Sequence, residues 1–517
     1  MMSRTKCGSV MRFGIGSYLI STLVETLNST PWSLVIDETT DVSVSAALAI
    51  VAQFYSAKDK RLMVSLIEIA NCCDATAIGI TDTVFEVFEK VGLKTSMLVG
   101  FCADTCNAMF GAHHSLATIL REQIQSIVTV KCNCHMSHLC SQKASLELPK
   151  IFEDVVRGTC THFSRSPKRR EAFKQFQKLV ECEEHMLISP GQTRWLTLEY
   201  AVVRVLEQYD ALVDYFRDLC ETDPTTANDV ILCGLEDPFI KIYLAFMSYA
   251  LNQFNEFNTL FQSQIPLFHL IKREHSRLIN IFARNFMEEE YVNSVNPLLL
   301  NPLESVKYLP EPEIYLAAVA IQPLSQHDAA AHAQQRAVIE KLEKDLKPLR
   351  HNCKRWFIVT IQQLQEKFDF RDPIYKITEL FDPVNARSLK PNSLTLLFRR
   401  FPNLNTMCNR QKADNEWRDH ASLPPSLFKV ETSDEVKKLS VESYCGLPFS
   451  NAIAERAFSV VDQVKTPLRN NLHNLSLSSL ILAQQWLKNE QASSASIEVP
   501  EGMVKGALKV KASATIN

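Results

Sequence analysis

The first strong hydrophobic pattern along the chain is an apolar run that stops abruptly at an acid. Three aliphatic residues, 34–36, lead directly into Asp37, as in a buried strand that carries a carboxylate at its end. The runs 46–55 and 62–70 are apolar and rich in β-branched residues, and the polar turn between them predicts a hairpin. Three strands are therefore predicted after a short N-terminal segment.

Helical and strand periods then alternate up to about residue 145. The predicted elements are a helix with its apolar face over 80–91, a strand at 97–104 that ends in Asp104, a helix at 108–124, a strand at 127–131 and a helix that begins near His135. The order βββαβαβα predicts a mixed sheet with helices packed on it.

Asp37 and Asp104 each stand at the end of a predicted strand. If the first and fourth strands lie side by side, both carboxylates reach one edge of the sheet. Ionised oxygens are the ligands that Mg²⁺ prefers. The pattern therefore favours a shared metal site about as much as it favours two solvated turns.

The pattern from 146 to 430 is mostly helical and is typical of a large insertion or a second domain. The next strong helical signal covers 447–466, and Glu455 lies nearly opposite the middle of its apolar stripe. That stripe consists of Ile453, Ala457, Val460, Val461 and Val464.

A second short helix is predicted at 475–487, and residues 491–517 have little periodicity, which predicts a disordered tail. A single short helix cannot bury its apolar side alone, so we expect this one to mediate dimerisation. Packing against the Glu455 helix within the chain is the alternative. The apolar residues are Leu477, Leu480, Ile481 and Trp486.

The composition is that of a globular protein of about three domains, with 517 residues, 46% hydrophobic and 22% charged. The net charge is −3, so any nucleic-acid site must be a local patch. The 15 cysteines are odd in number and follow no secretory leader, which favours reduced thiols in an intracellular protein. No apolar run reaches the ~18 residues of a membrane span, so we expect no membrane partner.

Six segments together resemble the hAT superfamily of cut-and-paste DNA transposases, in particular the transposase-derived proteins with BED or MYM-type zinc fingers. Each segment is weak alone, but the six occur in the family's order over roughly residues 30–490. The segments are Val35–Ser43, Gly100–Gly111, Lys131–His135, Phe163–Arg170, Gln192–Glu199 and Ser450–Ser459.

The resemblance implies a fold that is α/β plus all-α: an RNase H-like mixed-sheet core, interrupted by a large helical insertion and completed by a C-terminal hAT dimerisation region. The expected boundaries are 1–30 for a short N-terminal segment, 31–145 for the first part of the core, 146–430 for the insertion, 431–490 for the dimerisation region and 491–517 for the tail.

In active members of the family two aspartates and a glutamate hold two Mg²⁺ ions. The matching positions are Asp37, Asp104 and Glu455, which the resemblance marks as catalytic and metal-binding residues, with Mg²⁺ or Mn²⁺ as cofactor if the chain is active and none otherwise. Paired metals clamp the attacking and leaving oxygens of a phosphoryl transfer. Without the resemblance, Glu455 reads as a solvated helix acid.

The family's Cys-x-x-His element falls on Cys132 and His135, for which we expect a structural role, with His135 also in reach of DNA. A zinc site completed by Cys134 and His138 is a weaker alternative, because structural zinc sites usually join two separated ligand pairs.

Further nucleic-acid contacts are expected at Arg194 and Trp195, because a tryptophan of the family's insertion stacks on a displaced base. An indole packed under the following helix is the alternative. The densest basic run, with Phe173 and Phe176 interleaved at helical spacing, is a candidate phosphate-binding face or a solvated face. Its arginines and lysine, together with a lysine after Glu455, are Arg165, Lys168, Arg169, Arg170 and Lys465.

Two features depart from the family pattern. No finger-type ligand spacing precedes the first strand, which indicates a lost recognition module or a truncated chain, and Asp104 is followed by Thr-Cys-Asn, whose bulk would crowd a metal. We therefore expect a transposase-derived nuclear protein that forms a homodimer or higher homo-oligomer and binds DNA or chromatin partners, with no small-molecule substrate. The alternatives are an active DDE-type transposase and a helical protein-interaction scaffold.

Overall fold

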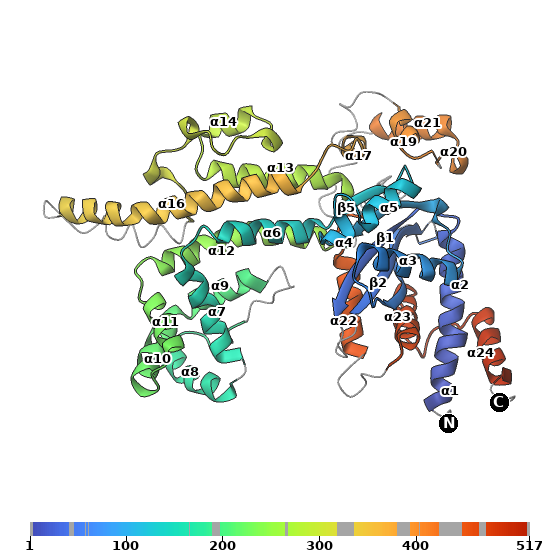
Figure 1. The fold of residues 1–517 in the computed structure, drawn as a ribbon, viewed down its shortest axis with the longest axis horizontal. Coiled ribbons are helices and arrows are strands. Elements are labelled where there is room, and N and C mark those ends of the chain that lie inside the picture. Colours follow the sequence, from blue (N-terminus) through green and yellow to red (C-terminus); the bar gives the residue numbers. More distant parts are fainter. Residues whose placement is uncertain are drawn as a thin grey trace. The chain divides into compact units, whose positions relative to one another are not determined.

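The computed structural model describes residues 4–40, 46–56, 58–59, 61–164, 166–188, 197–263, 267–317, 335–379, 393–402, 404–422, 447–464 and 472–513. The chain divides into two compact units (Figure 1). The first, called the sheet unit here, contains Met1–Asn133, Phe261–Ile271 and Phe370–Asn517. The second, called the helical unit, contains Cys134–Leu260 and Lys272–Asp369.

A five-stranded mixed sheet forms the centre of the sheet unit, with strand order β3-β2-β1-β4-β5. β1–β2 and β2–β3 pair antiparallel, whereas β1–β4 and β4–β5 pair parallel. The predicted mixed sheet and the predicted adjacency of the first and fourth strands are therefore confirmed. The strands are β1 (Trp32–Thr40), β2 (Ala46–Ser56), β3 (Arg61–Asn71), β4 (Leu98–Ala103) and β5 (Val128–Lys131).

Helices cover both faces of this sheet (Figure 1). Alternating side chains of a strand point to opposite faces, so Leu34 and Ile36 join one core and Val35 joins the other. The first core is closed by α2 (Ser17–Leu27), α3 (Ala77–Val91) and α5 (Leu116–Gln123). The second is closed by α22 (Ala452–Val464) and α23 (Asn474–Asn489).

The helix predicted over 108–124 is two helices, α4 (Asn107–Phe110) and α5. Ser115 starts α5 as a new N-cap, since its hydroxyl accepts a hydrogen bond from the Thr118 amide while the Thr118 hydroxyl accepts from the Ser115 amide. This capping box accounts for the break in the predicted helix.

The N-terminal segment and the C-terminal tail pack together as helices α1 (Arg4–Ser9), η1 (Val10–Gly16), α2 and α24 (Glu501–Ser513). A Cβ on Gly14 would lie 2.9 Å from the Cα of Ala507, so only glycine permits this close approach. The expectation of a disordered tail is therefore wrong for 501–513, because small residues let α24 dock.

Within the described residues one helix, Lys6–Leu27, is long and apolar enough to cross a membrane, with a mean hydropathy of 1.2. The expectation that no such segment exists is wrong. Leu23, Val24 and Leu27 are buried in the core of the sheet unit, and a helix packed on a sheet meets the same criteria of length and composition. Composition alone therefore does not assign this helix to a membrane.

The helical unit confirms the large helical region. Its centre is aromatic: Phe246, Phe282 and Phe357 surround the fully buried Trp356. Its helices are α6 (Asn133–Ser145, from the last residue of the sheet unit), α7 (Lys150–Ser164), α8 (Pro167–Leu179), α9 (Thr197–Glu207), α10 (Tyr209–Thr222), α11 (Thr226–Leu235), α12 (Ile240–Phe261), α13 (Ile271–Arg284), α14 (Glu289–Ser294) and α16 (Gln335–Lys367). Short helical turns lie at Pro297–Leu299, Ser305–Lys307 and Glu311–Glu313.

The boundary of the helical unit differs from the expected 146–430. Residues after 369 return to the sheet unit, where Arg400 donates hydrogen bonds to the carbonyls of Ser126 and Ile127 just before β5. The elements there are α17 (Ile374–Thr378), α19 (Thr395–Arg400), α20 (Leu404–Met407) and α21 (Arg410–Ser422), with short turns at Thr95–Met97 and Phe268–Leu270 elsewhere in the unit.

Candidate functional site

Asp37 and Asp104 lie at the same edge of the sheet. β1 and β4 run parallel, and Val35 is the register partner of Cys102. Each aspartate stands two residues beyond that pair. Asp104 directly follows β4, as predicted, but β1 continues to Thr40, so the prediction that Asp37 ends its strand is wrong. Asp37 instead lies within β1, where the pairing with β4 stops while the pairing with β2 continues. Side chains of equal offset share a face of a pleated sheet, which places the two acids on the same side.

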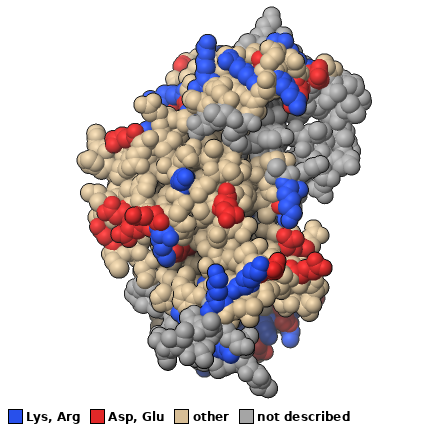
Figure 2. Space-filling model, turned by 90° about the vertical axis from the view of Figure 1, so that its right-hand side faces the viewer, with Lys and Arg blue, Asp and Glu red and all other residues tan. Residues whose placement is uncertain are grey.

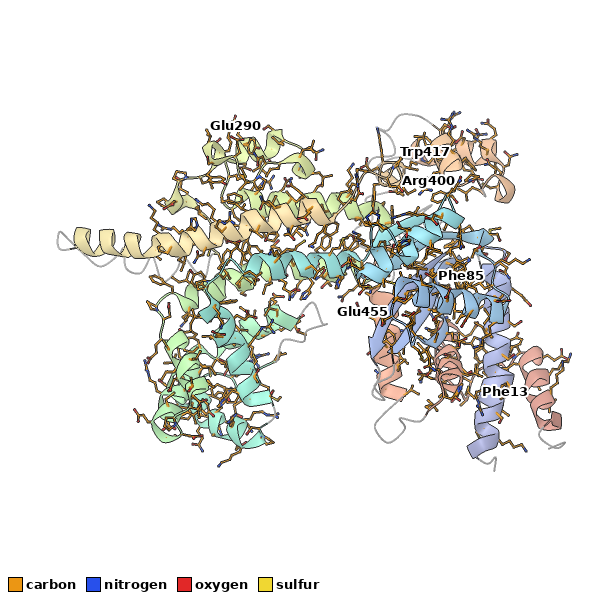
Figure 3. The ribbon with its side chains drawn as sticks, viewed as in Figure 1. Phe13, Phe85, Glu290, Arg400, Trp417 and Glu455 are labelled. Atoms are coloured by element: carbon orange, nitrogen blue, oxygen red, sulfur yellow. The ribbon has the colours of Figure 1, made fainter. Side chains whose placement is uncertain are left out.

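Helix α22 presents Glu455 to this edge from its first turn (Figure 3). The carbonyl of Asn451 accepts the amides of Ala454 and Glu455 at 2.8 and 3.1 Å, which starts the helix there. Three residues of the predicted apolar stripe, Ala457, Val461 and Val464, are buried against the sheet, which confirms the stripe at these positions. Glu455 lies off that stripe and is only partly buried.

The three acids influence one another electrostatically. Burial raises the pKa of Asp37 well above its usual range, and the charges of Asp104 and Cys132 raise it further. Burial also raises the pKa of Glu455 to about 9, with added effects of Cys132, Asp37 and Asp104, while Arg456 acts in the opposite direction. The side chains separated by hundreds of positions in the sequence therefore gather in one acidic, poorly hydrated region.

A buried amide connects the strand to the helix. Asn451 Nδ2 lies 3.4 Å from Asp37 Oδ1 and donates to it, and the Asn451 side chain is almost fully buried. Its Oδ1 has no hydrogen-bond partner within the described part of the chain. The sequence pattern did not single out Asn451 as a site residue, and its position one helical turn before Glu455 is the signal that could have marked it as part of the site.

The end of β5 completes this edge. The Cys132 amide donates to the Ala103 carbonyl at 2.9 Å, and its sulfur lies 3.7 Å from the Ser450 hydroxyl. Asn133 Nδ2 donates to the Phe449 carbonyl at 2.7 Å. The segment before α22 is thus fixed to the ends of β4 and β5, which fits the structural role expected of Cys132.

The donor chemistry at this edge fits a hard divalent cation, but the spacing of the side chains does not. The two carboxyls with raised pKa values, the nearby Asp104 and the amide oxygen of Asn451, which lacks a described partner, are groups that a cation would stabilise. Across the described ranges, however, no three His, Cys, Asp or Glu side chains are grouped closely enough to hold a metal ion. We therefore assign no metal-dependent step to this structure.

The same finding removes the zinc alternative at Cys132, Cys134, His135 and His138, all of which are described. In the helical unit, Cys134 is buried and donates to the Asn258 carbonyl at 3.7 Å. Half-buried His135 lies one helical turn from His138, whose pKa is lowered by burial and then by the charges of His135 and Arg157. These residues behave as packing and hydrogen-bonding groups.

The basic run lies on α8 and is partly committed to local structure. Arg169 donates to the His162 carbonyl at 3.2 Å and Arg170 to the Ser164 carbonyl at 3.3 Å, so both satisfy the end of α7. Phe173 is buried and anchors the helix, as the pattern predicted. Lys168 is exposed and makes no ion pair with any described residue.

Four predicted contact residues lie outside the described residues: Arg165, Arg194, Trp195 and Lys465. They remain predictions.

Part of the predicted dimer surface is internal. Leu477 and Ile481 are each only 1% exposed and pack on the sheet together with α22, while Leu480 and Trp486 are half-buried. The prediction that all four form an exposed apolar surface is wrong for Leu477 and Ile481, because α23 is needed to cover the second face of the sheet. The alternative of packing within the chain holds for these two side chains, and half-buried Leu480 contacts the same core with part of its surface.

The first part of the chain, which contains Asp37 and Asp104, matches a known family. Residues 15–114 match the model of the ZMYM1/FAM200, RNase-like domain. This is a transposase-derived family of RNase-like domains associated with MYM-type zinc finger proteins. The matched part of the RNase-like domain contains α2, β1, β2, β3, α3 and β4, and therefore both Asp37 and Asp104, whereas Glu455 reaches the domain from the C-terminal part of the chain.

Proposed function

We propose that the chain is a hAT-like, transposase-derived nuclear protein that dimerises through its C-terminal region and binds DNA or chromatin partners without requiring catalysis. The observation that carries the proposal is the convergence of Asp37, Asp104 and Glu455 at one edge of an RNase-like sheet. In the transposases that the chain resembles, acids at the matching positions hold the metal ions of a phosphoryl transfer on DNA. The spacing of the same acids favours a binding role over catalysis.

DNA binding is expected from local patches. Figure 2 looks onto the sheet unit, where basic and acidic side chains are interspersed over the described part of that face. A candidate contact on the helical unit is exposed Lys168 at the start of α8. Because each neutralised phosphate releases counterions, binding through Lys168 adds about one unit to the slope of log K against log salt.

The test measures the anisotropy of a labelled DNA duplex at several salt concentrations. Lys168→Gln is expected to weaken binding uniformly across sequences and to reduce the slope by about one. Lys347→Gln is a matched control, because Lys347 is also exposed but lies on α16. Equal binding by both variants and the wild type would remove Lys168 from the interface, and no binding by the wild type would refute the DNA proposal.

Dimerisation would use the half-buried side of α23. Leu480→Asp is expected to shift a concentration-dependent dimer to monomer in sedimentation without unfolding the chain. Ser476→Asp on the same helix places the same charge on a position outside the apolar set and is expected to leave the dimer intact. A wild type that stays monomeric at every concentration would exclude the dimer, and fluorescence microscopy of the full chain would test the nuclear location.

A second candidate function, DDE-type DNA cleavage, is favoured by the raised pKa values of Asp37 and Glu455. Perturbed carboxyls in one cluster are typical of catalytic sites. Bound Mg²⁺ or Mn²⁺ would supply a nucleophilic hydroxide and charge neutralisation. The coupling of the acids argues against the third alternative, a purely helical scaffold.

Cleavage is tested with labelled terminal-repeat DNA and either metal ion. Cleavage that Asp104→Asn abolishes and that Asp82→Asn preserves would establish the enzyme, since Asp82 is an exposed acid on α3 away from the strand ends. No cleavage with either metal leaves the binding function.

A further inference from the structure

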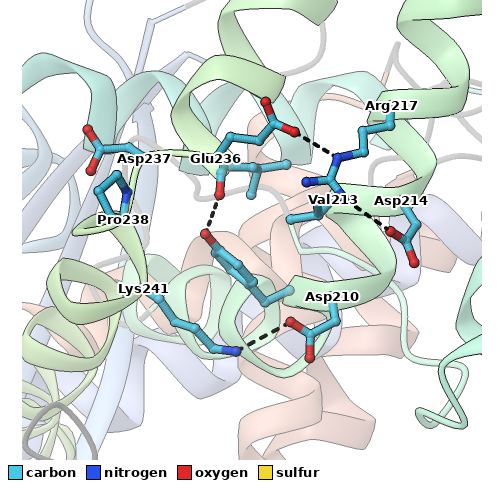
Figure 4. Close-up of a pocket in the computed structure, with 10 residues that line it drawn as sticks. Asp210, Val213, Asp214, Arg217, Glu236, Asp237, Pro238 and Lys241 are labelled. Carbon is cyan, nitrogen blue, oxygen red and sulfur yellow. Dashed lines mark hydrogen bonds and ion pairs between the residues drawn. The ribbon is translucent and has the colours of Figure 1, made fainter. Parts of the chain in front are cut away.

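A charged cavity lies in the helical unit, apart from the residues assigned above. It is formed where the start of α10, the end of α11 and the start of α12 meet, and it has a volume of about 450 Å³ (Figure 4). Ligand sites in proteins usually have volumes of ~300–1,000 Å³. The cavity is therefore large enough to accept a side chain from another molecule.

The lining of the cavity carries an excess of negative charge. Lys241 pairs with Asp210 at 3.3 Å, and Arg217 pairs with Glu236 at 2.7 Å. Within the part of the chain that the structure describes, the remaining two acids have no base of their own. Asp214 shares Arg217 at the longer distance of 3.7 Å, and Asp237 accepts the Phe239 amide at 2.8 Å.

Tyr209 forms an aromatic wall whose position is fixed. Its hydroxyl donates to the Leu235 carbonyl, and Lys241 Nζ lies 4.9 Å above the ring centroid. Burial raises the pKa of Tyr209 to about 12, and the surrounding acids contribute, so the hydroxyl remains a donor at neutral pH. The ring thus already holds a cation on its face within this cavity.

We propose that this cavity binds an arginine side chain from a basic peptide segment of a partner protein. A guanidinium group matches carboxylates through paired hydrogen bonds, and its flat surface packs on aliphatic walls such as Val213 and Pro238. The excess of carboxylates repels the phosphates of DNA, so the occupant is a protein cation. The proposal stands on the cavity and does not depend on DNA binding.

The test uses the full chain and a fluorescein-labelled peptide of alternating Arg and Gly residues. Asp214→Asn with Asp237→Asn removes the two acids that lack full neutralisation, and Asn at 237 keeps the oxygen that accepts the Phe239 amide. Fluorescence anisotropy is expected to show that the double variant binds the peptide about tenfold more weakly than the wild type, or more weakly still. A loss of this size corresponds to the contribution of one hydrogen bond between charged groups.

The matched control is Glu289→Gln with Glu290→Gln, which removes the same charge from exposed positions on α14 (Glu290 is labelled in Figure 3). The proposal requires that this control bind the peptide within about twofold of the wild type. Equal weakening by both double variants would indicate attraction to net charge alone and would overturn it, as would a wild type that does not bind the peptide. DNA affinity, measured in parallel, is expected to be unchanged by the cavity variant.

Discussion

The two units contain acidic clusters that differ in how their charge is compensated. In the sheet unit, Asp37 and Glu455 have pKa values raised by burial, with neighbouring acids and a thiol adding to the effect. In the helical unit, Asp210 and Glu236 pair with Lys241 and Arg217 at positions that remain open to water.

The difference is instructive because residue type alone does not distinguish the clusters. Burial away from a cation destabilises the ionised form of a carboxyl. Carboxyls with pKa values perturbed in this way cluster at functional sites. An exposed carboxylate beside a base is well solvated and contributes little to stability. Binding of a ligand or a proton is therefore expected to change the stability of the protein most at the cluster of the sheet unit. The cluster of the helical unit selects a ligand by its charge.

Helix α23, which packs with α22 on the second face of the sheet, gives the largest expected effect. Leu477→Ala removes a side chain that is 1% exposed between α23 and the sheet, and we expect a loss of about 2–5 kcal/mol in the free energy of unfolding. Urea denaturation measures it. Val213→Ala, at the half-buried wall of the cavity, serves as the comparison and is expected to cost clearly less. Equal losses would mean that α23 is not a core element.

The pH dependence of stability is the next largest effect. The usual pKa of a glutamate is 4.5, and that of folded Glu455 is about 9. Between these values folded Glu455 keeps a proton that the unfolded chain has released, so the contribution of Glu455 to stability falls as the pH rises from about 5 to 8. Glu455→Gln is expected to flatten this dependence, with a difference on the order of a few kcal/mol across the range.

The measurement is urea denaturation of both proteins at pH 5, 6, 7 and 8. Asp82→Asn, which removes an exposed acid, is the control and is expected to follow the wild type. Parallel curves for the wild type and Glu455→Gln would show that Glu455 ionises normally in the folded state.

The local patterns of the sequence were sufficient for the strands and for Asp104 at the end of β4, but not for the end of β1, which runs past Asp37 to Thr40. The hydrophobic pattern of a strand or helix involves only residues close together in the chain. The sequence therefore predicted β1, β4 and the apolar stripe of α22. The family resemblance was needed for Glu455, because nothing near it in the chain indicates its distant partners.

Contacts between distant segments could not be predicted in the same way. An apolar helix face such as that of α23 has the same pattern whether it covers the chain's own sheet or a second copy. The docking of α24 depends on Gly14, which lies nearly 500 positions away in the sequence. The same applies to the buried contact between Asn451 and Asp37.

The smallest expected effect lies in the second cluster. Asp210→Asn removes the partner of Lys241, and both side chains are largely exposed, at 74% and 48%. We expect a loss of roughly 1 kcal/mol or less, because water solvates the freed ammonium and salt screens the pair. Urea denaturation at low and high salt measures it. A loss as large as that of Leu477→Ala would mean that the cavity is a buried, structural network, and the contrast between the two clusters would not hold.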